Sequence, residues 1–261
     1  MSVKLCVLAS GSSGNSTYVA SNQTRILIDA GLSAKQTELR LASVNTHISE
    51  IDAICISHEH SDHTNGIRIL SKRYQIPIYT NYATAKVLNK NDKENNLKFN
   101  LFESGSTFSI GNFILESFKI PHDASEPVGF CISKNDTKIG IVTDIGTQTD
   151  LVIQKLKGCC CLVLESNHDL DLLQEAPRPW TLKQRIRSRQ GHLSNIEAAQ
   201  LIIDCATPKL NHVILAHLSS ECNSPEIALK TIHSQLRLNK LDHFSIEVSH
   251  ANQPTNMWIS E

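Results

Sequence analysis

The chain has 261 residues, of which 40% are hydrophobic and 20% charged, and its formal net charge is -1. This composition is typical of a globular protein large enough to bury a core. A net charge near zero excludes global attraction to nucleic acid or to a membrane surface, so any such partner needs a local charged patch. No stretch reaches the roughly 18 apolar residues that a membrane-spanning helix requires.

The N-terminus turns directly into a strand-like pattern and lacks the shape of a signal peptide. The eight cysteines lack the C-x-x-C pairs of a zinc module, and most of them lie in apolar runs. This pattern favours reduced thiols in a core over a disulfide framework. We therefore expect a cytoplasmic protein without a membrane segment.

The first part of the chain is rich in strand-like apolar runs. Two helical patterns follow, at 64–74 and 83–90, and the polar stretch 89–96 is expected to be a loop or a helix end. The predicted strands are 3–9, 16–20, 25–29, 52–57 and 76–79.

The second part repeats this organisation. Two hairpins are predicted, one joining 107–110 to 113–120 and one joining 128–133 to 138–143. Ser194 to Glu197 has the form of a capping box and predicts a helix to about residue 205. Ser224 before Pro225 predicts another helix, to about residue 236. Further strands are predicted at 160–165, 212–216 and 244–249.

Strands grouped with helices in each part favour two sheets packed face to face with helices outside. The predicted class is α/β, with a four-layer αββα sandwich. No linker rich in proline or glycine separates the two halves, which are about 1–120 and 121–261. We therefore expect one domain over residues 1–261.

The segment from His58 to His63 concentrates three imidazoles and two carboxylates. It follows the apolar run 51–56 and precedes a helical pattern, so it lies on a strand-to-helix turn. Burying such charges costs several kcal/mol unless they are paired or bound to metal. His58 and His60 are two residues apart and can reach one ion, whereas Asp62 and His63 point elsewhere and could hold a second.

Three later residues of metal-ligand type stand just past apolar runs: His122, Asp144 and His217. Side chains at strand ends commonly build the active sites of sheet proteins. Any one of them alone is more readily explained as a structural polar group whose hydrogen bonds are satisfied. Together with the His58–His63 segment, they favour a two-metal centre.

The motif His58-x-His60-x-Asp62-His63 resembles the H-x-H-x-D-H signature of the metallo-β-lactamase superfamily. Asp29, His122, Asp144 and His217 match its other motifs across nearly the whole chain. The resemblance implies an αββα sandwich with two divalent ions, zinc or manganese, with iron also possible. A water held between two such ions would be the nucleophile.

The resemblance also implies roles for these residues. One ion would take His58, His60 and His122. The other would take Asp62, His63 and His217, and Asp144 would bridge them. Asp29 would orient a ligand imidazole from behind.

A basic stripe precedes His192. It runs from Arg178 to Arg189, includes Trp180, and lies in a stretch without acidic residues between Glu175 and Glu197. The stripe is either a solvated basic face or a phosphate contact with a stacking surface. His192 stands at the start of the capped helix, where free backbone N–H groups favour an anion. It could donate a proton to a leaving oxygen or serve only as a turn residue.

Further stretches resemble the YycJ branch of the superfamily, also called WalJ or VicX: 9–15, 164–169, 186–195 and 216–219. That branch is similar to nucleases such as RNase Z, in which a Glu on one loop pairs with a His on another. The resemblance implies a Glu165–His192 pair and a 5′-to-3′ exonuclease that acts on DNA. DNA is favoured over RNA because we find no room for the inserted domain or extended arm of RNA-processing members.

The expected catalytic residues are Asp62, His192, Glu165 and Asp29. The expected substrate contacts are Arg185, Arg187, Arg189, Ser194, Asn195, Asn167, His168, Ser13 and Asn15. The same metal core also serves other reactions, so three alternatives stay open. They are a small-molecule hydrolase of the glyoxalase II or thioesterase type, an RNA-processing nuclease, and a non-enzymatic metal-binding regulator.

Overall fold

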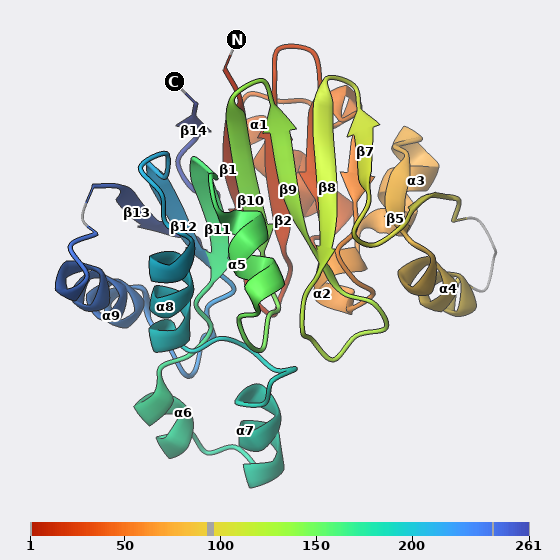
Figure 1. Cartoon of the computed structure of the whole chain (residues 1–261). Coiled ribbons are helices and arrows are strands. Elements are labelled where there is room, and N and C mark those ends of the chain that lie inside the picture. The colour runs from red at the N-terminus through yellow and green to blue at the C-terminus, as the bar shows by residue number, and fades with distance from the viewer. Residues whose placement is uncertain (1, 93–96, 242, 261) are drawn as a thin grey trace.

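The computed structural model of the chain describes residues 2–92, 97–241 and 243–260. Two mixed sheets form the centre of the molecule (Figure 1), and each has seven strands within the described residues. The first sheet has the order β14-β1-β2-β3-β4-β5-β6. Its strands are β1 (Lys4–Ala9), β2 (Ser16–Ala20), β3 (Arg25–Ile28), β4 (Ala53–Cys55), β5 (Ile78–Asn81), β6 (Phe99–Phe102) and β14 (Trp258–Ile259).

The second sheet has the order β13-β12-β11-β10-β9-β8-β7. The chain passes into it between β6 and β7, and its last strand β14 returns to pair with β1 in the first sheet. Strands β7 and β8 therefore belong to the second sheet although they lie before residue 121. The strands are β7 (Thr107–Ile110), β8 (Phe113–Lys119), β9 (Val128–Lys134), β10 (Thr137–Val142), β11 (Cys161–Glu165), β12 (His212–Ala216) and β13 (Ser245–Val248).

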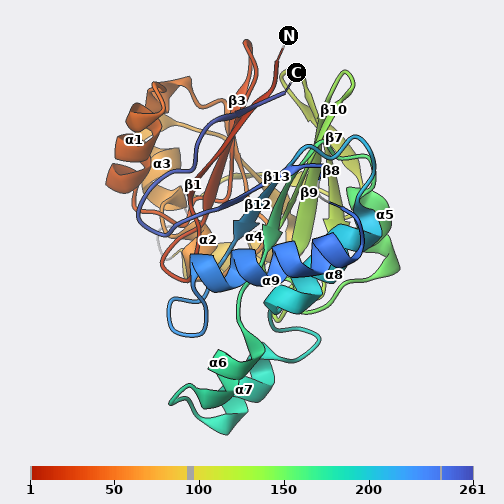
Figure 2. The same cartoon turned by 90° about the vertical axis from the view of Figure 1, so that its left-hand side faces the viewer.

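Helices cover the outer faces of both sheets (Figure 2). The first sheet carries α1 and α3, and the second carries α5, α8 and α9. Among the described residues the helices are α1 (Ala34–Ser43), α2 (Ser61–Thr64), α3 (Ile67–Tyr74), α4 (Tyr82–Asn91), α5 (Asp150–Leu156), α6 (Leu170–Glu175), α7 (Trp180–Ile186), α8 (Asn195–Cys205) and α9 (Pro225–Leu238), with a 3-10 turn at Ile48–Glu50.

Alternation along the strands builds the layers. In β1, Leu5 and Val7 enter the core between the sheets, while Cys6 and Leu8 enter the core under the helices of the first sheet. All four side chains are buried, because a strand turns successive side chains to opposite faces and both faces are covered here. This arrangement confirms the predicted four-layer αββα sandwich.

Most predicted strands and helices are present with slightly shifted bounds, but one predicted helix is divided. The pattern at 64–74 is split into α2 and α3 by Asn65 and Gly66. A Cβ on Gly66 would lie 2.3 Å from the carbonyl oxygen of Leu32, so glycine permits a close approach of two backbones. In the polar stretch 89–96, α4 continues to Asn91, and residues 93–96 lie outside the described part of the chain.

The sequence did not predict the pair α6 and α7, which projects from one end of the sandwich (Figures 1 and 2). Helix α7 has no buried residue, so no apolar face marks it in the sequence. We refer to residues 170–186 as the arm. Of the helices that the structure describes, none is long and apolar enough to cross a membrane.

Candidate metal centre

The clustered side chains stand at the carboxyl ends of strands from both sheets. Asp29 directly follows β3, and the segment that begins at His58 follows β4 in the first sheet. In the second sheet, His122 follows β8, Asp144 follows β10 and His217 follows β12. Because these strands run in the same direction within each sheet, their ends meet at one edge.

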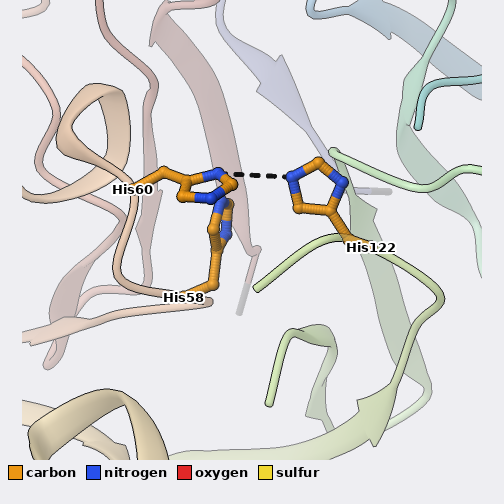
Figure 3. A group of neighbouring side chains, drawn as sticks. All are labelled: His58, His60 and His122. Atoms are coloured by element: carbon orange, nitrogen blue, oxygen red, sulfur yellow. Dashed lines mark hydrogen bonds between the residues drawn. The ribbon is translucent and has the colours of Figure 1, made fainter. Parts of the chain in front are cut away.

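The first donor set consists of three histidines that face one another (Figure 3). His60 Nδ1 lies 3.3 Å from His122 Nε2, and the ring centroids of His58 and His60 are 4.6 Å apart. The buried Nε2 of His58 has no hydrogen-bond partner among the described residues. Three imidazole nitrogens that converge around an unpartnered buried nitrogen fit a metal ion.

The second donor set consists of Asp62, His63, Asp144 and His217, whose donor atoms all lie within 4.8 Å of one another. His63 Nε2 is 2.8 Å from Asp144 Oδ2. Asp62 Oδ2 is 3.5 Å from Nε2 of both His63 and His217. Two imidazoles and two carboxylates provide the nitrogen and oxygen ligands that zinc, manganese and iron accept.

Asp144 lies between the two sets. Its Oδ1 is 3.7 Å from His122 Nε2 in the first set, while Oδ2 contacts His63 in the second. The side chain is buried, yet the charges of His217 and His63 outweigh burial and hold the pKa of Asp144 well below its usual range. The carboxylate is thus ionised and reaches both donor sets.

Electrostatics also fit a cation. Burial disfavours a charged imidazole at His63, but the carboxylates of Asp144 and Asp29 outweigh it and hold the pKa of His63 well above its ordinary value. Burial likewise opposes the charge on His217, but Asp144, Asp62 and Glu165 raise its pKa to about 10. In the metal-free protein, protons on His63 and His217 therefore offset the negative charge of the buried carboxylates. A bound metal ion would supply that positive charge instead.

His58 has the opposite environment. Burial, followed by the charge of His63, holds the pKa of His58 well below its ordinary value. This imidazole is neutral, and a neutral imidazole is the form that binds a metal ion.

Asp29 supports the second set from behind. Its Oδ2 accepts a hydrogen bond from His63 Nδ1 at 2.8 Å, and its Oδ1 accepts one from the backbone N–H of Ser57 at 2.8 Å. Because Nδ1 donates to a carboxylate, Nε2 of His63 is directed at the cluster. The structure thus places Asp29 behind His63, where the resemblance implies that it orients a ligand imidazole.

Asp62 is placed by a close backbone contact. The backbone N–H of Asn15 donates to the carbonyl oxygen of Asp62 at 2.7 Å, and Asn15 Nδ2 lies 3.2 Å from Asp62 Oδ2. A Cβ on Gly31 would lie 1.6 Å from the same carbonyl oxygen. Asn15 is buried and bonded within the chain, so the structure gives it a supporting position here.

Three clustered residues have left-handed backbone conformations, with φ of 62° at Asp29, 58° at Asp144 and 56° at His217. Such angles are uncommon outside glycine and cluster at functional sites. At each of these strand ends the sharp turn directs a polar side chain to the common edge.

Glu165 and His192 form the pair that the resemblance implied. His192 Nδ1 donates to Glu165 Oε1 at 2.7 Å, and His217 Nδ1 lies 3.0 Å from the same oxygen. Glu165 Oε2 accepts from the backbone N–H of Ile145 at 2.7 Å. Burial opposes the charge on His192, but Glu165 outweighs it and raises the pKa of His192. The protonated imidazole is therefore favoured.

A pocket of about 170 Å³ opens beside His192, between the metal centre and the arm. Arg178, Arg185 and Asn167 contribute to its lining, together with serines of the loop after His217. The exposed Trp180 lies on the arm. The arm thus brings part of the predicted basic stripe to the edge of the candidate site.

The remaining predicted substrate contacts fall into two groups. Arg185, Arg187, Arg189 and Ser13 are exposed. Ser194, Asn195, Asn167 and His168 are buried. Asn195 is bonded to Ser166 and Asn223, and Ser194 caps α8 as the predicted capping box requires. Asn167 Nδ2 donates to the carbonyl oxygen of His217 at 2.8 Å. Ser194 and Asn195 therefore support the site from within the chain, whereas Asn167 also contributes to the lining of the pocket. Nδ1 of the buried His168 has no hydrogen-bond partner among the described residues.

Sequence reasoning missed Asp123, which directly follows His122. Its Oδ1 lies 3.4 Å from His122 Nε2, and its Oδ2 accepts from Arg185 Nε at 2.5 Å. The sequence does contain one indication of its role, since an acidic residue directly follows the candidate metal ligand His122. Its pairing with Arg185 could not be found from the sequence, since the two residues are far apart in the chain.

The fold and the clustered donors define the class, and the chain belongs to the metallo-β-lactamase superfamily. The model of the family described as "Beta-lactamase superfamily domain" matches residues 24–217. The chain is 36% identical over 238 residues to "Exodeoxyribonuclease YycJ" of Bacillus anthracis, with 90% of each chain covered. It is 36% identical over 236 residues to "Exodeoxyribonuclease WalJ" of Streptococcus pneumoniae serotype 2, covering 89% of this chain and 88% of that protein.

Among solved structures, the metallo-β-lactamase fold protein YhfI of Bacillus subtilis superposes with a TM-score of 0.73 at 18% identity. The match covers 98% of this chain and 99% of YhfI. At this level of identity the likeness concerns the fold.

Proposed function

We propose that the protein is a dinuclear metal-dependent phosphodiesterase, and that it degrades DNA as a 5′-to-3′ exonuclease. The observation that carries the proposal is the position of Asp144 between two donor sets, beside a pocket lined by Arg178, Arg185 and His192. The two relatives named exodeoxyribonucleases favour DNA over RNA as the substrate.

In this proposal His58, His60 and His122 hold one divalent ion. Asp62, His63 and His217 hold the other, and Asp144 serves both. Zinc or manganese is the expected metal, and iron also suits these ligands. When bound, two such ions would lower the pKa of a nearby water and neutralise charge on a phosphoryl group.

The residues of the chain contribute the rest. Glu165 fixes the Nδ1 proton of His192, so Nε2 is the atom from which a proton can be donated to the leaving oxygen. Asp29 fixes the orientation of His63 in the same way. The exposed Arg187 and Arg189 follow the arm and can contact backbone phosphates.

We also propose that residues 1–261 form one domain, supported by the return of β14 to the first sheet. The eight free cysteines accord with the reducing compartment expected from the sequence, the cytoplasm.

The decisive experiment combines metal analysis with a comparison of substrates. The purified chain is loaded with zinc or manganese, and its turnover is measured on 5′-labelled DNA, on RNA of the same sequence and on a glutathione thioester. The proposal expects metal-dependent release of nucleotides from the 5′ end of DNA, abolished in the Asp144→Asn variant. Thioester cleavage without nuclease activity would establish the small-molecule hydrolase instead, and faster RNA cleavage would establish the RNA-processing nuclease.

A further inference from the structure

The pocket beside His192 lies at the junction of the arm with the sandwich. Arg178 stands just before α7, and Arg185 lies within it. Because α7 has no buried residue, the arm relies on a small apolar cluster around Leu173 and Cys222 and on polar contacts to the sandwich. Two of these contacts, one from each arginine, lie at this pocket.

Each arginine of the pocket is held by a carboxylate of the sandwich. Arg178 Nε donates to Glu221 Oε2 at 2.9 Å, and Arg185 Nε donates to Asp123 Oδ2 at 2.5 Å. The Nη atoms of both guanidinium groups make no hydrogen bond within the described residues. Both pairs are partly open to solvent, with side-chain exposures of 24% and 60% in the first and 62% and 27% in the second.

Both positive charges at the entrance of the candidate site are neutralised by negative charges, so the pocket does not attract anions through a net charge. A carboxylate and a phosphate present oxygen acceptors of the same kind to a guanidinium group. Glu221 and Asp123 thus occupy positions that substrate phosphate oxygens could take.

We propose that Asp123 and Glu221 are internal stand-ins for phosphate, and that a backbone phosphate of the polynucleotide displaces them to bind Arg178 and Arg185. The inference rests on the proposed function, since it needs a substrate with several phosphates. Partly exposed ion pairs are weak, so breaking them costs little free energy. A backbone phosphodiester carries one negative charge and two non-bridging oxygens, as a carboxylate carries one charge and two oxygens, so it can replace the carboxylate at each guanidinium group.

The exchange affects the metal centre because Asp123 contacts both Arg185 and His122. Its Oδ1 is buried, has no hydrogen-bond partner among the described residues, and lies 3.4 Å from His122 Nε2. Its backbone N–H also donates to the carbonyl oxygen of Gln190 in the segment that leads to His192. Asp123 is therefore a positioning residue that connects Arg185 with the first donor set.

Glu221→Gln is the sharpest test, because Gln keeps an acceptor for Arg178 and Glu221 is not among the clustered metal-type donors. The probe is a 5′-fluorescent oligodeoxythymidine titrated into the full chain without metal, so that it is bound and not cleaved. We expect the Kd to fall about fivefold. The slope of log Kd against log salt concentration should steepen by nearly the amount that one phosphate contact contributes. An unchanged or higher Kd would overturn the inference, since a merely structural ion pair predicts weaker binding.

Two controls separate the stand-in from a general charge effect. Asp171→Asn removes an exposed charge from α6 without touching the pocket, and it should leave the Kd within error. In an Arg178→Gln background, Glu221→Gln should lose most of its effect. A gain of the same size in that background would contradict the exchange.

Asp123→Asn provides a second, independent variant at the other pair. It should also tighten binding of the oligonucleotide, and in the metal-loaded enzyme it should lower KM. If wild-type protein cleaves DNA while neither variant binds it more tightly, the proposed function stands and the stand-in inference fails. If the wild-type protein cleaves no DNA but both variants bind the oligonucleotide more tightly, the proposed nuclease activity fails and the inference about phosphate binding stands.

Discussion

The Oε1 atom of Glu165 accepts a hydrogen bond from Nδ1 of His192 at 2.7 Å and lies 3.0 Å from Nδ1 of His217. One carboxylate therefore fixes the ring orientation of a proposed proton donor and of a proposed metal ligand. An ionised carboxylate can accept hydrogen bonds but cannot donate them. Both imidazoles therefore carry a hydrogen on Nδ1, and their Nε2 atoms point away from Glu165.

Glu165→Gln and His192→Gln should separate these two functions. Glu165→Gln is expected to weaken metal binding about 10- to 100-fold and to lower kcat as well, because it disturbs both histidines. His192→Gln should lower kcat by about 100-fold while metal affinity stays at the wild-type value. Metal affinity is measured by competition with a chromophoric chelator. Loss of metal from His192→Gln would contradict this division.

Asp144→Asn tests the bridge between the donor sets. Replacing the carboxylate by an amide removes a negative charge shared by both sets, so the bound metal per chain should fall and kcat/KM should drop by at least about 1,000-fold, or about 4 kcal/mol. Elemental analysis after desalting gives the metal content. Asp150→Asn, an exposed residue at the start of α5, is the matched control and should retain full metal content and activity.

Gly31→Ala tests how the backbone places Asp62. The new Cβ would lie 1.6 Å from the carbonyl oxygen of Asp62, so the backbone must move, and we expect a loss of about 3 kcal/mol in the free energy of unfolding, together with weaker metal binding. Gly158→Ala is the control, because a Cβ there meets nothing within 4 Å although φ is +79°. It should cost about 1 kcal/mol without any change in metal binding. Equal effects of both substitutions would argue against a specific role for Gly31.

His168 should make the metal-free protein sensitive to mild acid. Burial lowers its pKa from 6.5 to about 4, so between these values the unfolded state binds more protons than the folded state. The free energy of unfolding therefore decreases as pH falls through 6.5. Between about pH 7.5 and 5.5 this group should account for about 1.4 kcal/mol.

The measurement is urea denaturation of the metal-free wild type and of His168→Gln at both pH values. The stability difference between the two proteins isolates His168 from other titrating groups, and it should change by the stated amount. A difference independent of pH would show that folding does not shift the pKa of His168, and a difference of the opposite sign would show that the imidazole is protonated in the folded state.

The sequence predicted the sandwich and the clustered donors because both depend on short local patterns. Apolar runs ending in His122, Asp144 or His217 mark strands and their carboxyl ends without knowledge of the partners. Helix α1 could also have been found, since Ser33 caps it and Thr37 and Leu41 are buried at helical spacing. The sequence alone already contained these signals.

Other features depend on contacts between distant parts of the chain. Strand β14 consists of Trp258 and Ile259 and exists only because β1 pairs with it. The arm has little apolar surface, and its position is set by contacts such as Arg185 with Asp123. The burial of Asn195 and its hydrogen bonds to Ser166 and Asn223 are likewise tertiary properties, which a local motif does not show.

The left-handed backbone at Asp29, Asp144 and His217 has a consequence for how this fold can change. Non-glycine residues held in that region each carry on the order of 1 kcal/mol of conformational strain. Selection for heat resistance alone would place glycine at these three strand ends. The backbone strain would then be relieved, but the polar side chains of the candidate site would be lost. A thermostable descendant that still acts on its substrate must gain stability elsewhere, in the helices or the outer strands, and leave these turns strained.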